Sequence, residues 1–529
     1  MRDKGCHVGV SSRDREAFMK IQWGGVYLSV PLLLTLASLG CGSSNVTPQP
    51  VSAVVATAHP LVAQYGLSHF DSGLSAWVEF GPDTNYGRQT SVMTSSSGAA
   101  LGIQKLNILV AGMKPKTTYH MRAHATWAGG SWVDQDHTFT TGAVPSSIQL
   151  PTLAVTQPTS GVSPAPGVEL LSLTAVGAQG VVSDLQGNVI WYCPTNAEPL
   201  KPLPNGHFIV VNVTDLQEVD LSCNVLRDVS YTQVNQSLQA NGYSFTIPAP
   251  LGFAGGNPFH HDALVLPNGH WIALSQITKS FPDLPGYPGT TQVIGDAVID
   301  IDPNGNVTWA WSSFDHLDVH RYPYFGLPDW THSNALVYTA DGNLLVSMRN
   351  QSWILKLDYA DGTGTGNVLW KLGQDGDFTM SNGNSSDWFY AQHYPNVLSV
   401  NGSQTVLAVY DDGNARVASD GSSCPAAPPA PTCYSRATIF QIDESTNLAT
   451  LQWQYLPGFF SFWGGSIDAL SNNDIEFDSS APSNFTGSTI LEVTQTDSPQ
   501  VVWQMNISGS GAYRGYRIPS LYPGVTWQQ

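Results

Sequence analysis

Three histidines stand at the same position of three successive repeats in this chain. His261, His332 and His393 each precede the glycine of a following turn by eight to ten residues, and the neighbouring repeats have no histidine there. One such histidine would more often be a packed or surface residue, but three in register are hard to attribute to packing. Imidazole groups near neutral pH can attack an electrophile, carry protons or bind a metal ion.

Two polar residues near the second histidine favour an anion over a metal ion. Three histidines are a known catalytic zinc arrangement, but Arg349, which follows the next turn, would repel a cation from the same site. No carboxylate is obvious beside the second or third histidine to orient a metal-bound imidazole, although Asp262 adjoins the first. Together with the amide of Asn334, the planar guanidinium suits the oxygens of a sulfate or phosphate group.

Short strands are the elements that must position these side chains. From residue 168 to the end, units of roughly 60–70 residues repeat a turn, an apolar strand, a strand ending near an acid and a strand with an aromatic or apolar anchor. The turn sequence LPNGH at 203–207, for example, recurs at 266–270. Four short strands per unit are typical of a β-propeller blade. The spacing predicts six blades over 168–529, with five or seven blades and a β-sandwich array as alternatives.

The propeller geometry explains why the histidines would meet. Equivalent positions of neighbouring blades are related by rotation about the central axis, so the starts of the innermost strands converge at the mouth of the channel. His260 and His261 are adjacent, and strand alternation allows only one of them to face that channel. Its phase in the repeat favours His261, with His260 as the alternative.

The residues before the repeats predict a separate β-domain and a linker. Residues 52–142 alternate apolar and polar positions and resemble a fibronectin type III or immunoglobulin-like sandwich, in which the hydroxyl of Tyr119 would tie a corner to nearby backbone. Residues 143–167 are rich in Pro, Ser and Thr, which predicts an extended and only partly ordered connection.

The first 41 residues indicate export. A positive residue, an apolar run and small residues before Cys41 form a signal peptide that is too short for a comfortable membrane span. Cys41 resembles a lipoprotein acceptor, so we expect a periplasmic protein or a membrane-anchored lipoprotein, with plain secretion as the alternative. In an oxidising compartment the nearest cysteine pairs are 193–223 and 424–433.

The charge balance excludes one class of partner. The formal net charge is −19 and only 12% of residues are charged. A nucleic-acid partner would require clustered Lys and Arg, so we expect none.

Several motifs around the histidines are similar to one enzyme family. The sequence DWTHSN at 329–334, followed by SMRNQ at 347–351, resembles the bacterial arylsulfotransferases (aryl sulfate sulfotransferases). The same holds for FHHD at 259–262, VLWKLG at 368–373 with Gln392 and His393, and AYRGYR at 512–517. Members of that family are exported and join an amino-terminal β-domain to a six-bladed propeller, so the resemblance implies an all-β chain of this architecture.

The resemblance also implies a reaction and a set of roles. An aryl sulfate ester would donate its sulfuryl group to the family's histidine nucleophile, matched by His393, and a phenolic acceptor would then receive it in a ping-pong sequence without nucleotide, cofactor or metal. His332 matches the proton donor and acceptor. His261, Asn334 and Arg349 match residues that hold the sulfuryl oxygens. The sequence leaves a homodimer open.

Two other functions are compatible with the residues. One is a non-catalytic propeller that binds sulfated or phenolic ligands, and the other is a hydrolase or lyase in which the three histidines hold a metal ion. The identities of the donor and the acceptor cannot be read from the sequence.

Overall fold

The fold is all-β, as the sequence predicts, and short helices occur only in connections. The computed structural model describes most of the chain, namely residues 49–70, 73–95, 105–174, 179–195, 199–250, 256–416, 424, 433–480 and 486–528. The predicted signal peptide and Cys41 lie outside these residues. Within them, no helix has the length and apolar character needed to span a bilayer.

Residues 51–140 form two antiparallel sheets. One contains β1 (Val51–Ala56), β2 (Ala63–Ser68) and β6 (Lys105–Val110). The other is built on β3 (Ser75–Gly81) and β7 (Thr118–Trp127), which pair with β4 (Arg88–Gln89), β5 (Met93–Thr94), β8 (Gly130–Val133) and β9 (His137–Thr140). Burial alternates along β2 and β3, so one face of each strand contributes to the core. The Tyr119 hydroxyl accepts a hydrogen bond from the backbone N–H of Lys114 at 2.9 Å, so this hydroxyl binds nearby backbone as the sequence predicts.

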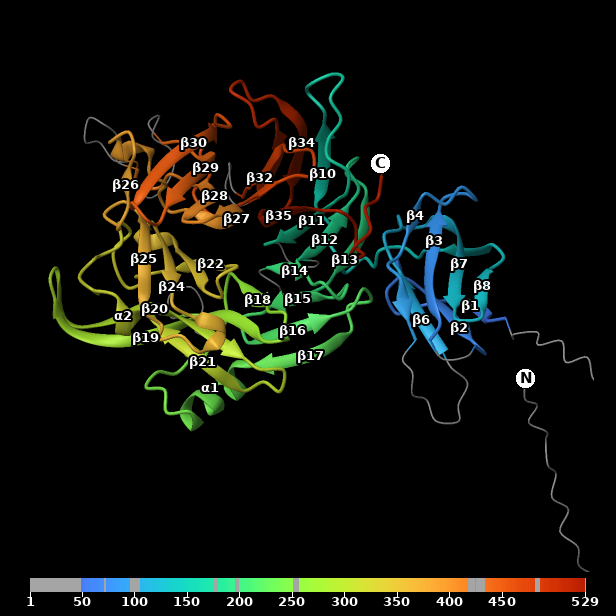
Figure 1. Ribbon diagram of the computed structural model, residues 1–529, viewed down its shortest axis with the longest axis horizontal. Coiled ribbons are helices and arrows are strands. Elements are labelled where there is room, and N and C mark those ends of the chain that lie inside the picture. Colours follow the sequence, from blue (N-terminus) through green and yellow to red (C-terminus); the bar gives the residue numbers. More distant parts are fainter. Residues whose placement is uncertain are drawn as a thin grey trace, which may run out of the picture. The chain divides into compact units, whose positions relative to one another are not determined.

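The remaining strands form six sheets that follow one another in chain order, from teal through yellow to red in Figure 1. Three of the sheets comprise β14 (Leu200–Pro202), β15 (Phe208–Val211), β16 (Asp215–Val219) and β17 (Val225–Ser230); β18 (Ala263–Val265), β19 (Trp271–Leu284), β20 (Tyr287–Ile301) and β21 (Val307–Ser312); and β22 (Ser333–Tyr338), β23 (Leu344–Met348), β24 (Trp353–Leu357) and β25 (Val368–Gly373). Helix α1 (Tyr231–Ala240) follows β17, and α2 (Ser313–His316) follows β21.

Two further sheets carry an additional strand each. The first consists of β27 (His393–Asn401), β28 (Gln404–Asp411), β29 (Arg436–Asp443) and β30 (Leu448–Tyr455), with β26 (Thr379–Met380) parallel to β30. The second consists of β31 (Ser466–Ala469), β32 (Ile475–Ser479), β33 (Gly487–Val493) and β34 (Val501–Ser508), with β10 (Thr152–Thr156) at its edge. The predicted linker therefore does more than connect two domains, because part of it pairs with β34 over five residues.

The remaining sheet, which is the first in chain order, joins the two ends of the repeat region. The last strand, β35 (Ala512–Ile518), pairs with β11 (Val168–Leu173), which is followed by β12 (Gly180–Ser183) and β13 (Val189–Cys193). Strands of successive sheets also contact one another, from β15 through β18, β22, β27 and β31 to β35. The starts of these strands are consequently brought close together, and this is where the three histidines lie.

Side-chain contacts fix the sheets to one another. Apolar clusters lie between neighbouring sheets, for example Leu274, Val298, Val346 and Leu355 between the β18–β21 and β22–β25 sheets. Both predicted disulfides are present, one between Cys193 and Cys223 and one between Cys424 and Cys433.

Candidate active site

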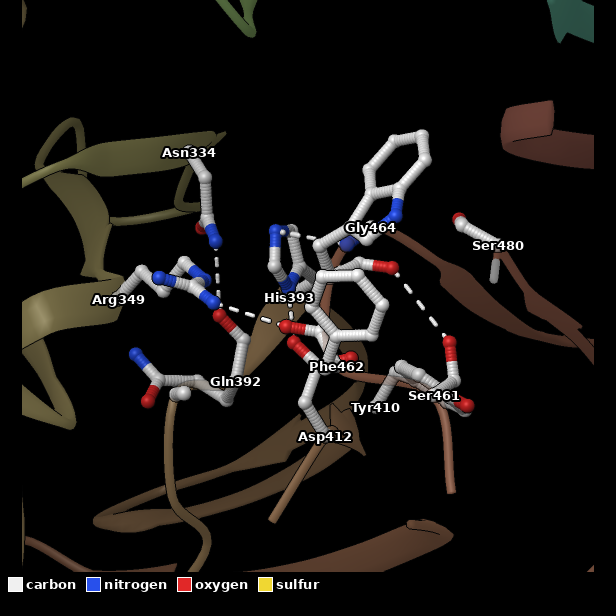
Figure 2. A network of polar contacts seen from close by, with 12 residues as sticks. Asn334, Arg349, Gln392, His393, Tyr410, Asp412, Ser461, Phe462, Gly464 and Ser480 are labelled. Carbon is white, nitrogen blue, oxygen red and sulfur yellow. Dashed lines mark hydrogen bonds and ion pairs between the residues drawn. The ribbon is translucent and has the colours of Figure 1, made fainter. Parts of the chain in front are cut away.

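His393 is held between two partners that use its two ring nitrogens differently. It is the first residue of β27 and is buried. Its Nδ1 donates to a carboxylate oxygen of Asp412 at 2.5 Å, and its Nε2 accepts from the backbone N–H of Gly464 at 3.2 Å (Figure 2). Because a backbone N–H can only donate, Nε2 must carry the lone pair and Nδ1 the proton. Nε2 is therefore the nucleophilic atom of this ring.

Burial and nearby positive charge keep this ring neutral. Burial, followed by the fields of Arg349 and Arg514, holds the pKa of His393 well below the ordinary histidine value. The pKa of Asp412 is raised well above its ordinary value, mainly by burial and also by Asp411 and Asp478, against the opposing field of Arg349. A buried carboxylate in such surroundings is stabilised when the ring beside it becomes positive, as it does when Nε2 forms a bond.

His332 belongs to a second chain of polar groups. Its Nδ1 donates to Asp329 at 2.5 Å, and its Nε2 lies 3.1 Å from Nε2 of His261. Burial alone would raise the pKa of Asp329, but His332 and then Arg349 lower it below its usual value, so this carboxylate is ionised. The pKa of His261 is well below the ordinary value, chiefly because the ring is buried and also because of His332 and other positive groups. His332 therefore lies between an ionised carboxylate, Asp329, and a neutral imidazole, His261.

The backbone around His332 is fixed from both sides. His332 has a φ of 49°, in the left-handed region that non-glycine residues seldom adopt. One carboxylate oxygen of Asp296 accepts from the Thr331 hydroxyl and from the backbone N–H of Ser333, each at 2.6 Å. These two bonds hold the residues before and after His332 and so keep its ring directed at His261.

The structure distinguishes the two adjacent histidines. The side chain of His261 meets His332, whereas Nε2 of His260 lies 3.2 Å from Asp296, away from that contact. His260 is buried and turned at a large angle to His261. The position favoured by phase in the repeat, His261, is thus the one that contacts His332.

Asn334, on β22, and Arg349, directly after β23, border the nucleophile candidate, as Figure 2 shows. The Arg349 guanidinium donates to the carbonyls of Phe462 at 2.8 Å and of the Asn350 side chain at 3.0 Å, and its Nε has no hydrogen-bond partner among the described residues. Asn334 donates at 2.8 Å to the carbonyl of Gln392, the residue before His393. The amide and the guanidinium therefore lie beside the backbone and ring of His393.

A second arginine adds positive charge near His261 and His393. Arg514, on β35, is fully buried, donates to the backbone carbonyl of Asn334 and lies 3.5 Å from Asp262. The ring of Tyr513 stacks on His261 at a centroid distance of 5.2 Å and meets His393 edge-on at 6.0 Å. Tyr513 therefore contacts the rings of both histidines.

The donor set suits an anion. The described part of the chain contains no group of three His, Cys, Asp or Glu side chains placed to hold a metal ion. Two guanidinium groups border the histidines instead, and a fixed arginine fork matches the oxygens of a sulfuryl group.

A comparison with protein families decides what this site belongs to. A family model described as arylsulfotransferase (ASST) matches residues 166–517, about two thirds of the chain. The chain belongs to the arylsulfotransferase family. No curated protein matches it.

Solved structures add little to this assignment. A Bacteroides caccae protein of unknown function covers 67% of this chain and 100% of its own, with 11% identity and a TM-score of 0.39. A mutant apocarotenoid oxygenase from Synechocystis covers 88% of this chain and 82% of its own, with 8% identity and a TM-score of 0.28. Likenesses this weak carry no argument about the arylsulfotransferase domain.

Sequence reasoning missed the two carboxylates of this arylsulfotransferase site. No carboxylate was obvious from the sequence beside the second and third histidines, but Asp329 and Asp412 bind them at 2.5 Å each. Asp262, the carboxylate that the sequence did suggest, pairs with Lys201 and Arg514 instead. Asp329 could have been found from the sequence, because it lies only three residues before His332 in the DWTHSN motif. Asp412 follows the end of β28 and has no such local signal.

Proposed function

We propose that this protein moves a sulfuryl group from an aryl sulfate ester to a phenolic acceptor through a sulfohistidine at His393. The observation that carries the proposal is the state of the His393 ring, whose Nδ1 proton is held by Asp412 while Nε2 keeps its lone pair. A neutral, oriented imidazole of this kind is a nucleophile at neutral pH.

The first half-reaction follows from these positions. Nε2 of His393 gives up the hydrogen bond that it accepts from the Gly464 N–H and forms a covalent bond to sulfur. The bond between sulfur and the aryl oxygen breaks. The electron pair goes to the aryl oxygen, which takes the proton from Nε2 of His332 and leaves as the phenol. The sulfohistidine ring gains positive charge, and Asp412 stabilises it through Nδ1. His332 is then neutral, with its Nδ1 proton still bound to Asp329.

The second half-reaction reverses these roles. The hydroxyl of a phenolic acceptor gives its proton to Nε2 of His332, and its oxygen attacks the sulfur. The bond between sulfur and nitrogen breaks, and its electron pair returns to Nε2 of His393. The aryl sulfate product leaves, and both histidines are back in their starting protonation states.

Fixed donors explain how the charge on the transferring group is tolerated. The sulfuryl oxygens carry negative charge throughout the reaction, and Arg349 has an unpartnered Nε in the described structure. Donors that are already in place need not reorganise during the reaction, which lowers the barrier most in a site closed to water.

We further propose that the six sheets are the blades of a six-bladed propeller. Three observations support this: the six sheets succeed one another in chain order, one strand of each contacts a strand of the next from β15 through β18, β22, β27 and β31 to β35, and β35 pairs with β11 of the β11–β13 sheet. In this arrangement the starts of β22 and β27 face the axis, where the histidines meet.

Steady-state turnover tests the proposed reaction. Phenol release from an aryl sulfate should be fast with a phenolic acceptor and slow without one, and double-reciprocal plots at several acceptor concentrations should be parallel. His393→Ala should abolish turnover, whereas His320→Ala, at an exposed position paired with Asp318, should leave it unchanged. Absence of phenol release from the wild-type protein under both conditions would refute the proposal.

A further inference from the structure

Two neighbouring aromatic residues in the connection between α2 and β22 lie against Arg349. The guanidinium carbon of Arg349 is 4.8 Å from the ring centre of Phe325, and the ring of Tyr324 lies 3.8 Å from that of Phe325. The Phe325 side chain is 39% exposed although it is large and apolar. The Arg349 guanidinium is therefore bordered by a pair of aromatic rings, and the exposed part of Phe325 is an apolar surface on which a ligand can pack.

The hydroxyl of Tyr324 is a second unusual feature of this pair. It is buried and has no hydrogen-bond partner among the described residues. Burial raises its pKa, and the charged groups that act on it are Arg349 and Asp412, the two that also border His393. The hydroxyl is therefore protonated at neutral pH and is a donor without an acceptor at the edge of the active site. A buried donor without an acceptor costs stability, and an acceptor atom of a bound ligand would satisfy it.

The connection that carries the aromatic pair is anchored at both ends. Before the pair, the carbonyl of Arg321 accepts from the indole of Trp330 at 3.0 Å and from the amide of Gln351 at 3.3 Å. After the pair, the backbone N–H of Leu327 donates to the hydroxyl of Tyr287 at 3.0 Å. Side chains on a segment fixed in this way can contact a ligand with defined geometry.

We propose that Phe325 is the surface on which the aryl group of the sulfate ester packs, and that Tyr324 donates a hydrogen bond to the ester oxygen that becomes the phenolate. This inference rests on the proposed sulfuryl transfer. Arg349 holds the sulfuryl oxygens beside the same ring pair, so an ester bound there has its aryl group over Phe325. The Tyr324 hydroxyl then shares the charge that develops on the leaving oxygen before His332 delivers its proton.

A series of aryl sulfates with leaving phenols of different acidity tests the role of Tyr324. Tyr324→Phe keeps the ring and removes the donor, so kcat/KM should fall by at least about tenfold for esters of weakly acidic phenols. It should change little for nitrophenyl sulfate, whose leaving oxygen needs little stabilisation. Tyr322→Phe is the matched control, because it removes a hydroxyl from the same segment, where the ring packs on Tyr287 instead, and it should leave all rates unchanged.

A second variant tests the packing surface. Phe325→Leu should raise KM for aryl donors several-fold with a smaller effect on kcat, because it removes aromatic contact and leaves the two reacting histidines unaltered. Circular dichroism and thermal unfolding show whether each variant is folded. Equal rates for Tyr324→Phe and wild type across the whole series would overturn the inference, as would a uniform loss for every ester. Both results require an active wild-type enzyme and so differ from failure of the sulfuryl transfer itself.

Discussion

The two nitrogens of the His393 ring have different partners, and this difference determines what the ring can do. Asp412 fixes the proton on Nδ1, and Gly464 meets the lone pair on Nε2. His332 differs in that its Nε2 meets another imidazole and its carboxylate, Asp329, is ionised. In the proposed reaction each histidine–aspartate pair has one task, which is bond formation for the first pair and proton transfer for the second.

Replacement of the Asp412 carboxyl group should impair the nucleophile. In Asp412→Asn, the amide no longer stabilises the positive ring, and it can also favour the wrong tautomer. We expect the rate of phenol release in a single turnover to fall by about two to four orders of magnitude. Asp318→Asn is the control, since it changes an exposed carboxylate that also binds a histidine. A loss of less than threefold in Asp412→Asn would show that this pair does not activate the ring.

The pH dependence of the first half-reaction should show the depressed pKa of His393. Only the neutral ring attacks, so phenol release should persist as pH falls through 6.5 and decline only at lower pH. Arg349→Gln removes a positive neighbour and so makes protonation of His393 easier. The acidic limb of the rate profile should then move to higher pH, in addition to any loss of rate. An acidic limb at the same pH in both proteins would contradict this explanation of the shift.

The shared position in the repeat predicts a contact between histidines, but it does not predict the hydrogen-bond partners of each ring. His261 and His332 come from adjacent sheets at the same phase, and they meet at 3.1 Å. Asp412 and Gly464 reach His393 from positions 19 and 71 residues later in the chain. Such contacts depend on how successive sheets pack, which no local pattern in the sequence encodes.

At the scale of elements, short strands and the turns between them place the reacting groups at strand starts. β27 begins at His393 itself, and β22 begins one residue after His332. Composition was a poorer guide to β10, whose Pro/Ser/Thr-rich surroundings predicted a partly ordered linker. Its partner, β34, is more than 300 residues away, and pairing over that separation leaves no local signal.

A disulfide reinforces two neighbouring sheets away from the site. Cys193 ends β13, and Cys223 lies in the turn after β16, 30 residues later. The loop-entropy model gives about 3.5 kcal/mol of stabilisation for a loop of this length. The variant with both residues changed to Ser should therefore lose about that much free energy of unfolding in urea, with unchanged single-turnover rates. Equal urea midpoints for variant and wild type would contradict the prediction.

At the scale of the molecule, the last strand connects the two ends of the repeat region. Arg517 on β35 pairs with Glu169 on β11, Glu476 on β32 and Glu492 on β33, at distances of 2.8–3.0 Å. All four side chains are almost entirely buried. One cation therefore pairs with three acids from the first and last sheets. This cluster thus helps to hold the two ends of the repeat region together.

Loss of that cation should weaken the whole fold in a pH-dependent way. Arg517→Met leaves three buried carboxyl groups without a cation, and we expect a loss of about 3–5 kcal/mol in the free energy of unfolding. Burial already raises the pKa of Glu169 to about 7, so the folded state binds protons that the unfolded state releases above about pH 4. The contribution of this cluster to the free energy of unfolding falls as pH rises towards 7. The variant should therefore lose more of this free energy at pH 8 than at pH 5.5. Urea unfolding at both pH values checks this, and a larger loss at pH 5.5 would contradict it.

The covalent intermediate on His393 is the most direct test of the proposed function. The wild-type protein should be mixed with an aryl sulfate in the absence of acceptor, digested at alkaline pH and analysed by mass spectrometry. We predict that one sulfuryl group is added to the peptide containing His393, and that a phenolic acceptor removes it before digestion. A sulfuryl group on another residue, or phenol release by an active protein with no adduct on His393, would contradict the account.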